Sequence, residues 1–483
     1  MLLGTVAPLP LPRIQWGGDA YATPGGPLLR SRWALFTALA LGAAAWLAIP
    51  ACRPAADPQT LRFRFWGDTE EIKVIQGLLT QFEAAHPGVH IKAERKNPDG
   101  TYADELLAEF AVHSAPDVMF LSTDNVDVVS KGFKLADLNR FLAQDPDLKA
   151  SDYYQAIIRR FTRSKRLVAL PRDVAPVACI YYNKALFDQA GLAYPKDGWT
   201  WDDLRSDAIK LTHRDASGQP SQLGFADDWN LVDAWILSSG GRQVDDFAAP
   251  TRFTFAERKS LDGILFRWKL MQKDRVMPSS EDGQALSGGP AVQFVAGHLA
   301  MFHSGLWKTP SFRAIQGFDW DVAPFPRKKG VKPRYWGGGS GYGIRADAAN
   351  PALCWELVKF MAGPIGQERL AASGLAQPAL RAMAKSPAFL DGQKPANKRM
   401  LLACAEHMQA SPAWTRWTEF GRTVWAPMTD PLWIKGYSGD PVALIKQVQA
   451  QGNERFFGIR PPAAKARKKK PAPARRSTGY RGR

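Results

Sequence analysis

The chain has 483 residues, a formal net charge of +17, 45% hydrophobic residues and four cysteines. This length predicts two to four domains or lobes, and the ordinary apolar fraction excludes wholesale disorder. Four cysteines are too few for a scaffold held together by disulfides. The net charge alone would fit a nucleic-acid binder, but ten Lys and Arg residues and no acid fall within residues 460–483. The body is therefore only mildly basic, and nucleic acid is not an expected partner.

The N-terminal region has the pattern of an export signal. Residues 1–29 are rich in proline and glycine and form a doubtful extension. Two arginines then precede an uncharged run over 33–49, which is typical of a signal peptide. The run leads into Ile-Pro-Ala-Cys52, which resembles a bacterial lipobox and implies lipidation of the Cys52 sulfur. We predict a signal peptide with lipobox over 30–52. A plain cleaved signal or an uncleaved anchor helix is the alternative, and every case places the body outside the cytoplasm.

The first elements of the body alternate between strand and helix. Residues 61–66 alternate in hydrophobicity and predict a strand. Asp68 and Glu71 are spaced as in a capping box, and apolar residues at helical spacing follow until Pro87-Gly88. The next predicted elements are a strand, a helix and a strand over 89–93, 102–113 and 117–121. This order predicts a parallel sheet with right-handed crossovers.

Strand and helix signals continue along the chain. Residues 167–170 and 177–182 predict strands on either side of Pro171. Thr200 begins a second capping-box helix, and Asn350 stands before a proline at a first helical position. Three cysteines of the body lie in apolar segments and are predicted to be small buried thiols: Cys179, Cys354 and Cys404.

Motifs for catalysis and cofactor binding are missing from the sequence. The glycine-rich run over 337–343 has neither the dinucleotide-binding spacing nor a Gly-Lys-Ser/Thr, so no phosphate loop is expected. Ser340 is followed by Tyr342 where a nucleophile elbow requires glycine. His86 and His90 are separated by a Pro-Gly turn and do not share a helix face, so no metal ion is expected. We therefore expect no cofactor and no enzyme.

A series of short motifs stands in a fixed order: FWG over 65–67, FEAAHP over 82–87, APDV over 115–118, LPRD over 170–173, YYNKALF over 181–187, WTWDDL over 199–204, FVAGHLAM over 294–301, GLW over 305–307, APFP over 323–326, and the glycine-rich run. Each motif is weak alone. Together, over 60–387, they resemble the family 1 extracellular solute-binding proteins, the sugar-type receptors of bacterial ABC importers. The match fades beyond about 390.

This resemblance implies an α/β fold of the periplasmic-binding-protein type (type II-like), with two discontinuous lobes joined by a hinge. Residues 60–172 and about 326–375 would form the N-lobe. Residues 173–325 and about 376–458 would form the C-lobe, and 459–483 a disordered basic tail. The segments 170–176 and 324–336 would cross between the lobes, and closure on ligand would be a hinge motion.

The resemblance also implies the function. The protein would capture a carbohydrate and deliver it to the transmembrane subunits of an ABC permease, as a monomer in the periplasm or cell envelope. A lipid anchor would hold it at the membrane, and the basic tail would either add attraction to anionic lipid or be a solvated extension. The alternative ligand is an anionic solute, such as a sugar acid, sugar phosphate or glycerol phosphate. A glycan-processing enzyme is less favoured, because it would require two carboxylates at a defined separation.

Residue types that suit a sugar are aromatic rings for its C–H faces and carboxylates for its hydroxyls. Fourteen of the seventeen tryptophans follow residue 59. The candidate ligand-binding residues are Trp66, Asp68, Asp124, Asp173, Trp229, Trp307, Trp336, Gly338 and Gly339, with Asp228 a weaker candidate. Core packing is an equal alternative for Trp66, helix capping is favoured for Asp68, and the glycines could serve only to make a turn.

Two further groups are interpreted as structural. Arg172 and Arg334 flank the proposed cleft, and an inward-pointing arginine would indicate an acidic ligand; we expect both to be surface charge. A late cluster of tryptophans is expected in a lobe core: Trp414, Trp417, Trp425 and Trp433.

Overall fold

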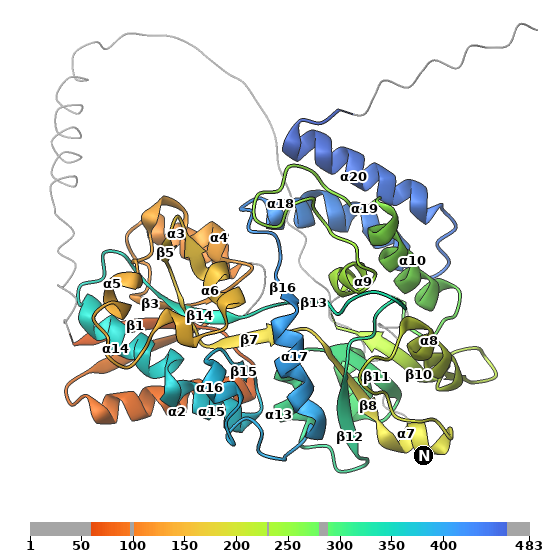
Figure 1. Ribbon diagram of the computed structural model, residues 1–483, viewed down its shortest axis with the longest axis horizontal. Helices are drawn as coiled ribbons and strands as arrows, with labels where there is room; N and C mark the ends of the chain where they lie inside the picture. The colour runs from red at the N-terminus through yellow and green to blue at the C-terminus, as the bar shows by residue number, and fades with distance from the viewer. Residues whose placement is uncertain (1–58, 97–100, 229–230, 280–287, 461–483) are drawn as a thin grey trace, which may run out of the picture. The chain divides into compact units, whose positions relative to one another are not determined.

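A computed structural model describes residues 59–96, 101–228, 231–279 and 288–460 (Figure 1). These residues belong to one compact unit that begins at Pro58. The predicted signal peptide with Cys52, the candidate Trp229 and the tail after residue 460 lie outside the described residues. Within the described ranges, no helix is both long and apolar enough to cross a membrane.

The first sheet has the strand order β2-β1-β3-β14-β6. Its parallel part consists of β1 (Thr60–Phe65), β2 (His90–Arg95) and β3 (Val118–Ser122), connected by helices α2 (Thr69–Ala85) and α3 (Tyr102–Ala111). The parallel sheet predicted from the element order is confirmed. Two strands join it antiparallel, β14 (Ser340–Ile344) beside β3, and β6 (Leu170–Pro171) beside β14. We call the part of the molecule built on this sheet the N-lobe.

The second sheet has the order β12-β8-β11-β10-β9. Its strands are β8 (Cys179–Asn183), β9 (His213–Arg214), β10 (Pro220–Asp227), β11 (Leu299–Ser304) and β12 (Trp320–Pro324). The same part of the molecule carries helices α8 (Trp201–Lys210), α9 (Val232–Ser238), α10 (Arg258–Gln272) and α20 (Pro441–Phe457) (Figure 1). We call it the C-lobe. Strand β8 runs antiparallel to both of its neighbours, so this sheet is mixed.

A small sheet in the order β15-β7-β13-β16 lies between the two lobes (Figure 1). It is formed by β7 (Asp173–Pro176), β13 (Tyr335–Gly338), β15 (Gln377–Pro378) and β16 (Met408–Gln409). Strand β7 carries the chain from β6 toward β8, and β13 leads back into β14. We call β7 and β13 the crossing strands. They run antiparallel, with Gly338 opposite Ala175.

Each lobe has its own buried core. The N-lobe core includes Phe63, Phe82, Phe120 and Tyr342, and the C-lobe core includes Tyr181, Trp235, Phe302 and Trp320. The late tryptophans pack in or against the C-lobe core, as expected. All three cysteines of the body are buried and free, which confirms that prediction.

The structure corrects some predicted element bounds. The strand expected over 167–170 is two short strands with different partners, β5 (Arg166–Leu167) beside β4 (Thr162–Arg163), and β6 beside β14. The strand expected over 177–182 begins only at Cys179. The two predicted helix starts are confirmed. Thr200 forms a capping box with Asp203, and Asn350 caps α14 (Pro351–Ala362).

The glycine-rich run serves close packing of the crossing region. A Cβ on Gly339 would lie 2.6 Å from the carbonyl oxygen of Asp173, and one on Gly341 would lie 2.5 Å from that of Leu170. Neither glycine has a left-handed φ. The chain therefore uses glycine here because two backbones approach closely, and not to make a turn.

We predict opposite effects for two Gly-to-Ala substitutions. Gly341→Ala forces a methyl group against buried backbone and should lower the free energy of unfolding by about 1–3 kcal/mol. Gly77→Ala lies in the exposed interior of α2 with no atom within 4 Å, and should raise stability by up to about 1 kcal/mol. Urea unfolding of both variants measures the difference. Equal effects would contradict the close-packing explanation.

Candidate functional site

The candidate site lies along one face of the crossing strand β13. Because side chains alternate along a strand, Trp336 and Gly338 share a face. A Cβ on Gly338 would lie 2.1 Å from the Oγ1 of Thr123, and the Thr123 amide donates to the Gly339 carbonyl oxygen at 3.0 Å. This face therefore borders the loop that follows β3, where Asp124 lies.

Asp124 lies between the N-lobe strand β3 and the segment that follows β16. It follows the N-lobe strand β3, and one carboxylate oxygen accepts a hydrogen bond at 3.1 Å from the hydroxyl of Ser411, just beyond β16. The structure thus brings together three of the predicted residues, Asp124, Trp336 and Gly338.

The surroundings of Asp124 raise the pKa of its carboxyl. Its side chain is exposed to solvent, yet desolvation by the surrounding protein raises the pKa of its carboxyl, against the opposing charge of Arg160 and the hydrogen bond from Ser411. Asp124 is therefore an exposed carboxyl whose surroundings disfavour its charged form.

A second carboxylate, Asp233, lies on helix α9 of the C-lobe, near enough to Asp124 to be influenced by its charge. Burial raises its pKa to about 6; the hydrogen bond from Gln243 at 2.7 Å opposes this shift, and the charge of Asp124 adds to it. The two carboxylates come from different lobes and are close enough to interact. Sequence reasoning missed Asp233, because it lies in the first turn of α9, where an acid is ordinary.

Trp336 offers an open hydrogen-bond donor. Its ring is half-buried and packs against the C-lobe core, and its indole Nε1 is buried without a hydrogen-bond partner among the described residues. Because a buried N–H without a partner is costly, this indole is suited to receive an acceptor from a ligand.

Trp66 and Asp68 lie just beyond the carboxyl end of β1, in the N-lobe. The Trp66 ring is half-buried and lies edge-on to Tyr102 and against Phe120, with ring centroids 4.7 and 4.1 Å away. Asp68 is exposed and caps α2, since its Oδ1 accepts from the amide groups of Glu70 and Glu71 at 3.2 and 3.1 Å. The capping role favoured for Asp68 is present, whereas the full capping box is not, because the Glu71 carboxylate binds Arg172 instead.

Arg172 was expected on the surface and is buried. Its Nε donates to Asp173 at 2.8 Å and to the Ser340 hydroxyl at 3.0 Å, and its guanidinium lies over the Phe120 ring at 4.3 Å. Burial alone would lower the pKa of Arg172, but the charges around it, Glu71 foremost, raise it well above its ordinary value. The prediction failed because two of its partners, Glu71 and Ser340, are distant in sequence.

Asp173 is held within the same network. One carboxylate oxygen accepts from the Ser340 amide at 2.9 Å, and the other accepts from Arg172 and the Ser340 hydroxyl. Both oxygens therefore already have partners in the protein. We call Glu71, Arg172, Asp173 and Ser340 the hinge network, because they join α2, the crossing strand β7 and β14.

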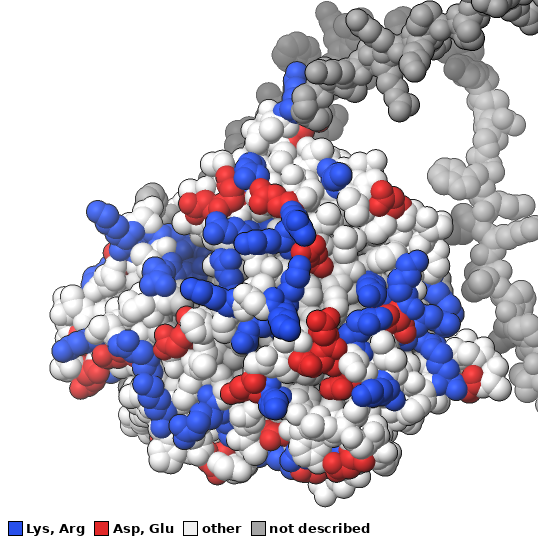
Figure 2. Space-filling model, turned by 45° about the vertical axis from the view of Figure 1, so that its right-hand side comes forward, with Lys and Arg blue, Asp and Glu red and all other residues white. Residues whose placement is uncertain are grey.

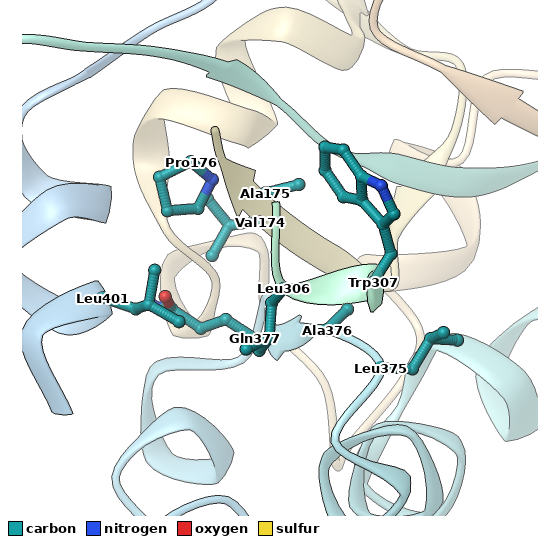
Figure 3. A pocket seen from close by; sticks show the side chains of 9 residues that line it. All are labelled: Val174, Ala175, Pro176, Leu306, Trp307, Leu375, Ala376, Gln377 and Leu401. Atoms are coloured by element: carbon teal, nitrogen blue, oxygen red, sulfur yellow. The ribbon is translucent and has the colours of Figure 1, made fainter. Parts of the chain in front are cut away.

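Trp307 lines a small hollow beside the crossing strands (Figure 3). It follows β11, in the turn Leu306–Lys308, and packs against Leu375 and its neighbours. Ala175 lines the same hollow, and it lies opposite Gly338 in the strand register. The buried Gln377 also lines it and has an amide oxygen without a hydrogen-bond partner among the described residues.

Asp228, the weaker candidate, is buried at the end of β10. It accepts a hydrogen bond from Ser304 at 2.9 Å and lies 3.5 Å from the Lys308 ammonium, and burial raises the pKa of its carboxyl. Its neighbour Trp229 is not among the described residues. Across the described ranges, no cluster of three or more His, Cys, Asp or Glu could hold a metal ion.

Comparison with known proteins decides the family. Residues 66–368 match the bacterial extracellular solute-binding proteins. The chain belongs to this family. A curated relative of this solute-binding protein, an uncharacterized lipoprotein in the oleD 5' region of Streptomyces antibioticus, is 26% identical over 360 residues, which cover 70% of this chain and 74% of the relative.

Solved structures show the same fold. The ABC substrate-binding protein Lmo0181 from Listeria monocytogenes, in complex with cycloalternan, is similar with a TM-score of 0.73 at 20% identity, covering 83% of this chain and 99% of that chain. Maltose-bound MalE3 of T. maritima gives a TM-score of 0.67 at 19% identity, covering 81% and 98%. The predicted two-lobed α/β fold and family are therefore confirmed. The protein is an extracellular solute-binding protein of the ABC-transporter type and not an enzyme.

We predict a pH-dependent contribution of Asp233 to stability. Its pKa of about 6 in the folded protein exceeds the ordinary value of about 3.9, so the folded state binds more protons than the unfolded state between about pH 4 and 6. The free energy of unfolding contributed by this group should therefore fall as pH rises through that window and level off above it.

Urea unfolding of the wild type and Asp233→Asn between pH 4 and 7 measures this contribution as the difference between two curves. Asp124→Asn should lower the Asp233 pKa, because it removes a neighbouring negative charge; NMR titration of the carboxyl carbon reads this directly. Parallel pH profiles for the wild type and Asp233→Asn would contradict the assignment.

Proposed function

We propose that this protein captures a carbohydrate between its N-lobe and C-lobe and delivers it to the transmembrane subunits of an ABC permease. The observation that carries the proposal is the grouping of Trp336, with its open indole donor, and two carboxylates from different lobes, Asp124 and Asp233. An aromatic face and hydrogen-bond acceptors are the two features that a sugar requires. The similar proteins from Listeria monocytogenes and T. maritima are bound to cycloalternan and maltose, which supports the same ligand class.

Roles follow from the positions of the residues. Trp336 covers a C–H face of the sugar, and Asp124 and Asp233 accept hydrogen bonds from its hydroxyls. Trp66 and Trp307 contribute further aromatic surface at the N-lobe and C-lobe ends of the site. Four other predicted ligand residues keep a ligand role in this proposal: Trp229 as an aromatic contact, Gly338 and Gly339 as close-approach backbone, and Asp68 as a rim acceptor. Asp173, predicted as a ligand acid, is instead proposed to position β7, because both of its oxygens already have partners in the protein.

Ligand capture needs no chemical step, because hinge closure of the two lobes is enough to present the sugar. The hinge network supplies a rigid N-lobe end for β7, so movement falls on the strands beyond it. We further propose that Cys52 carries a lipid anchor; the relative from Streptomyces antibioticus is named a lipoprotein. The protein then acts as an anchored monomer at the outer face of the membrane.

The direct test of the ligand class is a thermal-shift panel of neutral mono- and oligosaccharides, followed by calorimetry on any that bind. A ligand at 100 times its dissociation constant should stabilise the folded protein by about 2.7 kcal/mol. Trp336→Ala should weaken binding about tenfold or more, because it removes the stacking face, and Trp336→Phe should retain much of the affinity. Trp268→Ala, which removes a half-buried C-lobe tryptophan outside the site, is the matched control. Equal losses in Trp336→Ala and Trp268→Ala would show that the proposed site is wrong.

Delivery to the permease is tested in cells. Deleting the gene should abolish uptake of the sugar identified in the panel, and Cys52→Ser should release the protein from the membrane fraction. Uptake that persists after deletion would refute the transport role. Membrane retention of Cys52→Ser would refute the lipid anchor alone.

A further inference from the structure

Arg334 and Arg242 border the candidate site. Arg334 precedes Trp336 by two residues and so continues its face of the crossing strand. Its guanidinium donates to the side-chain oxygen of Gln409 at 3.0 Å and lies 5.3 Å from the Phe247 ring centroid. Gln409 in turn lies opposite Trp336 in the register of β13 and β16.

Arg242 is linked to the same region through its neighbour Gln243. It directly precedes Gln243, which donates to Asp233. Its guanidinium donates to the backbone carbonyl of Asp245 at 3.0 Å. Two effects lower the pKa of the Arg334 guanidinium. Burial is the larger one, and the positive charge of Arg242 is the second. The two arginines thus lie near each other at the edge of the carboxylate pair.

Neither arginine has a carboxylate partner within the described part of the chain. Figure 2 shows basic and acidic side chains interspersed over the face that it presents. Eight other buried or half-buried arginines pair with acids: Arg62, Arg64, Arg160, Arg163, Arg172, Arg205, Arg267 and Arg345. The half-buried Arg334, like Arg327, has no ion pair among the described residues, and the charge of Arg242 acts on it.

We propose that the captured carbohydrate bears an anionic group, a carboxylate or phosphate, which binds to Arg242 and Arg334. The planar guanidinium matches both anions with paired hydrogen bonds, and an anion would relieve the repulsion between the two arginines. This inference rests on the proposed function, because the same ligand must place hydroxyls on Asp124 and Asp233.

The carboxylates exclude a bare anion as the ligand. Asp124 and Asp233 repel a small anion that fills the site, but accept hydrogen bonds from the neutral hydroxyls of a sugar ring. A sugar acid or sugar phosphate satisfies both halves of the site, with its charged group at the arginines and its ring beside Trp336.

The test is calorimetry with matched neutral and acidic sugars: glucose, glucuronate and glucose 6-phosphate, and the pair maltose and digalacturonate, with inorganic phosphate as the bare anion. We expect the acidic members to bind at least tenfold more tightly than their neutral counterparts, and to lose affinity between 50 and 500 mM NaCl.

Arg334→Gln and Arg242→Gln should each weaken the binding of the acidic sugars by about 10- to 100-fold and leave the binding of the neutral sugars unchanged. Arg334→Lys should restore part of the loss.

Lys332→Gln is the matched control, since it removes one positive charge from an exposed position of the same loop. Arg242 is also exposed, so Arg242→Gln decides the matter if Arg334→Gln does not fold. Neutral sugars that bind as tightly as acidic ones, or equal effects of Arg242→Gln and Lys332→Gln, would overturn this inference and leave the proposed function standing. Phosphate that binds as tightly as the acidic sugars would overturn the assignment to a sugar. Binding of neither sugar class would overturn the inference and the proposed function together.

Discussion

The close contact between the crossing strands and the strands beside them is the constraint on which the rest of the structure depends. The chain must leave the N-lobe through β7 and return through β13, and the backbones there approach so closely that Gly339 and Gly341 cannot carry a side chain without displacing a carbonyl oxygen. The same approach sets the Ser340 amide on the Asp173 carboxylate. The backbone geometry at the hinge therefore depends on the lack of a side chain at Gly339 and Gly341 as well as on the hydrogen bond between Ser340 and Asp173. Because β13 is fixed in this way, the face that carries Trp336 is also fixed toward the loop of Asp124.

Buried arginines are paired with opposite charges inside the lobes, whereas the two carboxylates of the candidate site are not in direct ion pairs with any described residue. In the C-lobe, Arg267 and Asp227 form a buried pair with two hydrogen bonds of 2.9 and 2.8 Å, and in the N-lobe the hinge network surrounds Arg172 with two carboxylates. Such pairs are costly to break, because either partner left alone would be an uncompensated buried charge. Asp124 and Asp233 have weaker compensation: the hydrogen bond from Ser411 and the charge of Arg160 act on Asp124, the hydrogen bond from Gln243 acts on Asp233, and burial still raises the pKa of both. A folded chain tolerates that arrangement where a ligand supplies the missing partners.

The sequence predicted what depends on neighbouring residues and missed what depends on distant ones. The β1-α2-β2-α3-β3 order follows from local periodicity, and the caps at Thr200 and Asn350 follow from residues three or four apart. The surface position expected for Arg172 was wrong because its partner Glu71 is 101 residues away. Asp233 has no local signal, because only the fold sets it opposite Asp124. For the glycine-rich run, composition indicated a special backbone, but only the strand register showed that it serves packing.

If the proposed site is right, the raised pKa of the two carboxylates links ligand binding to closure of the lobes. Burial makes the ionised forms of Asp124 and Asp233 less favourable, so bringing the lobes together around them without a ligand has an electrostatic cost. Sugar hydroxyls donate to ionised carboxylates and lower that cost, since hydrogen bonds to the charged form favour it. A ligand shifts a conformational equilibrium only through its different affinity for the two states. In the proposed site the carboxylate pair would supply that difference, because its acceptors are contributed by both lobes and one ligand would satisfy them only when the lobes meet.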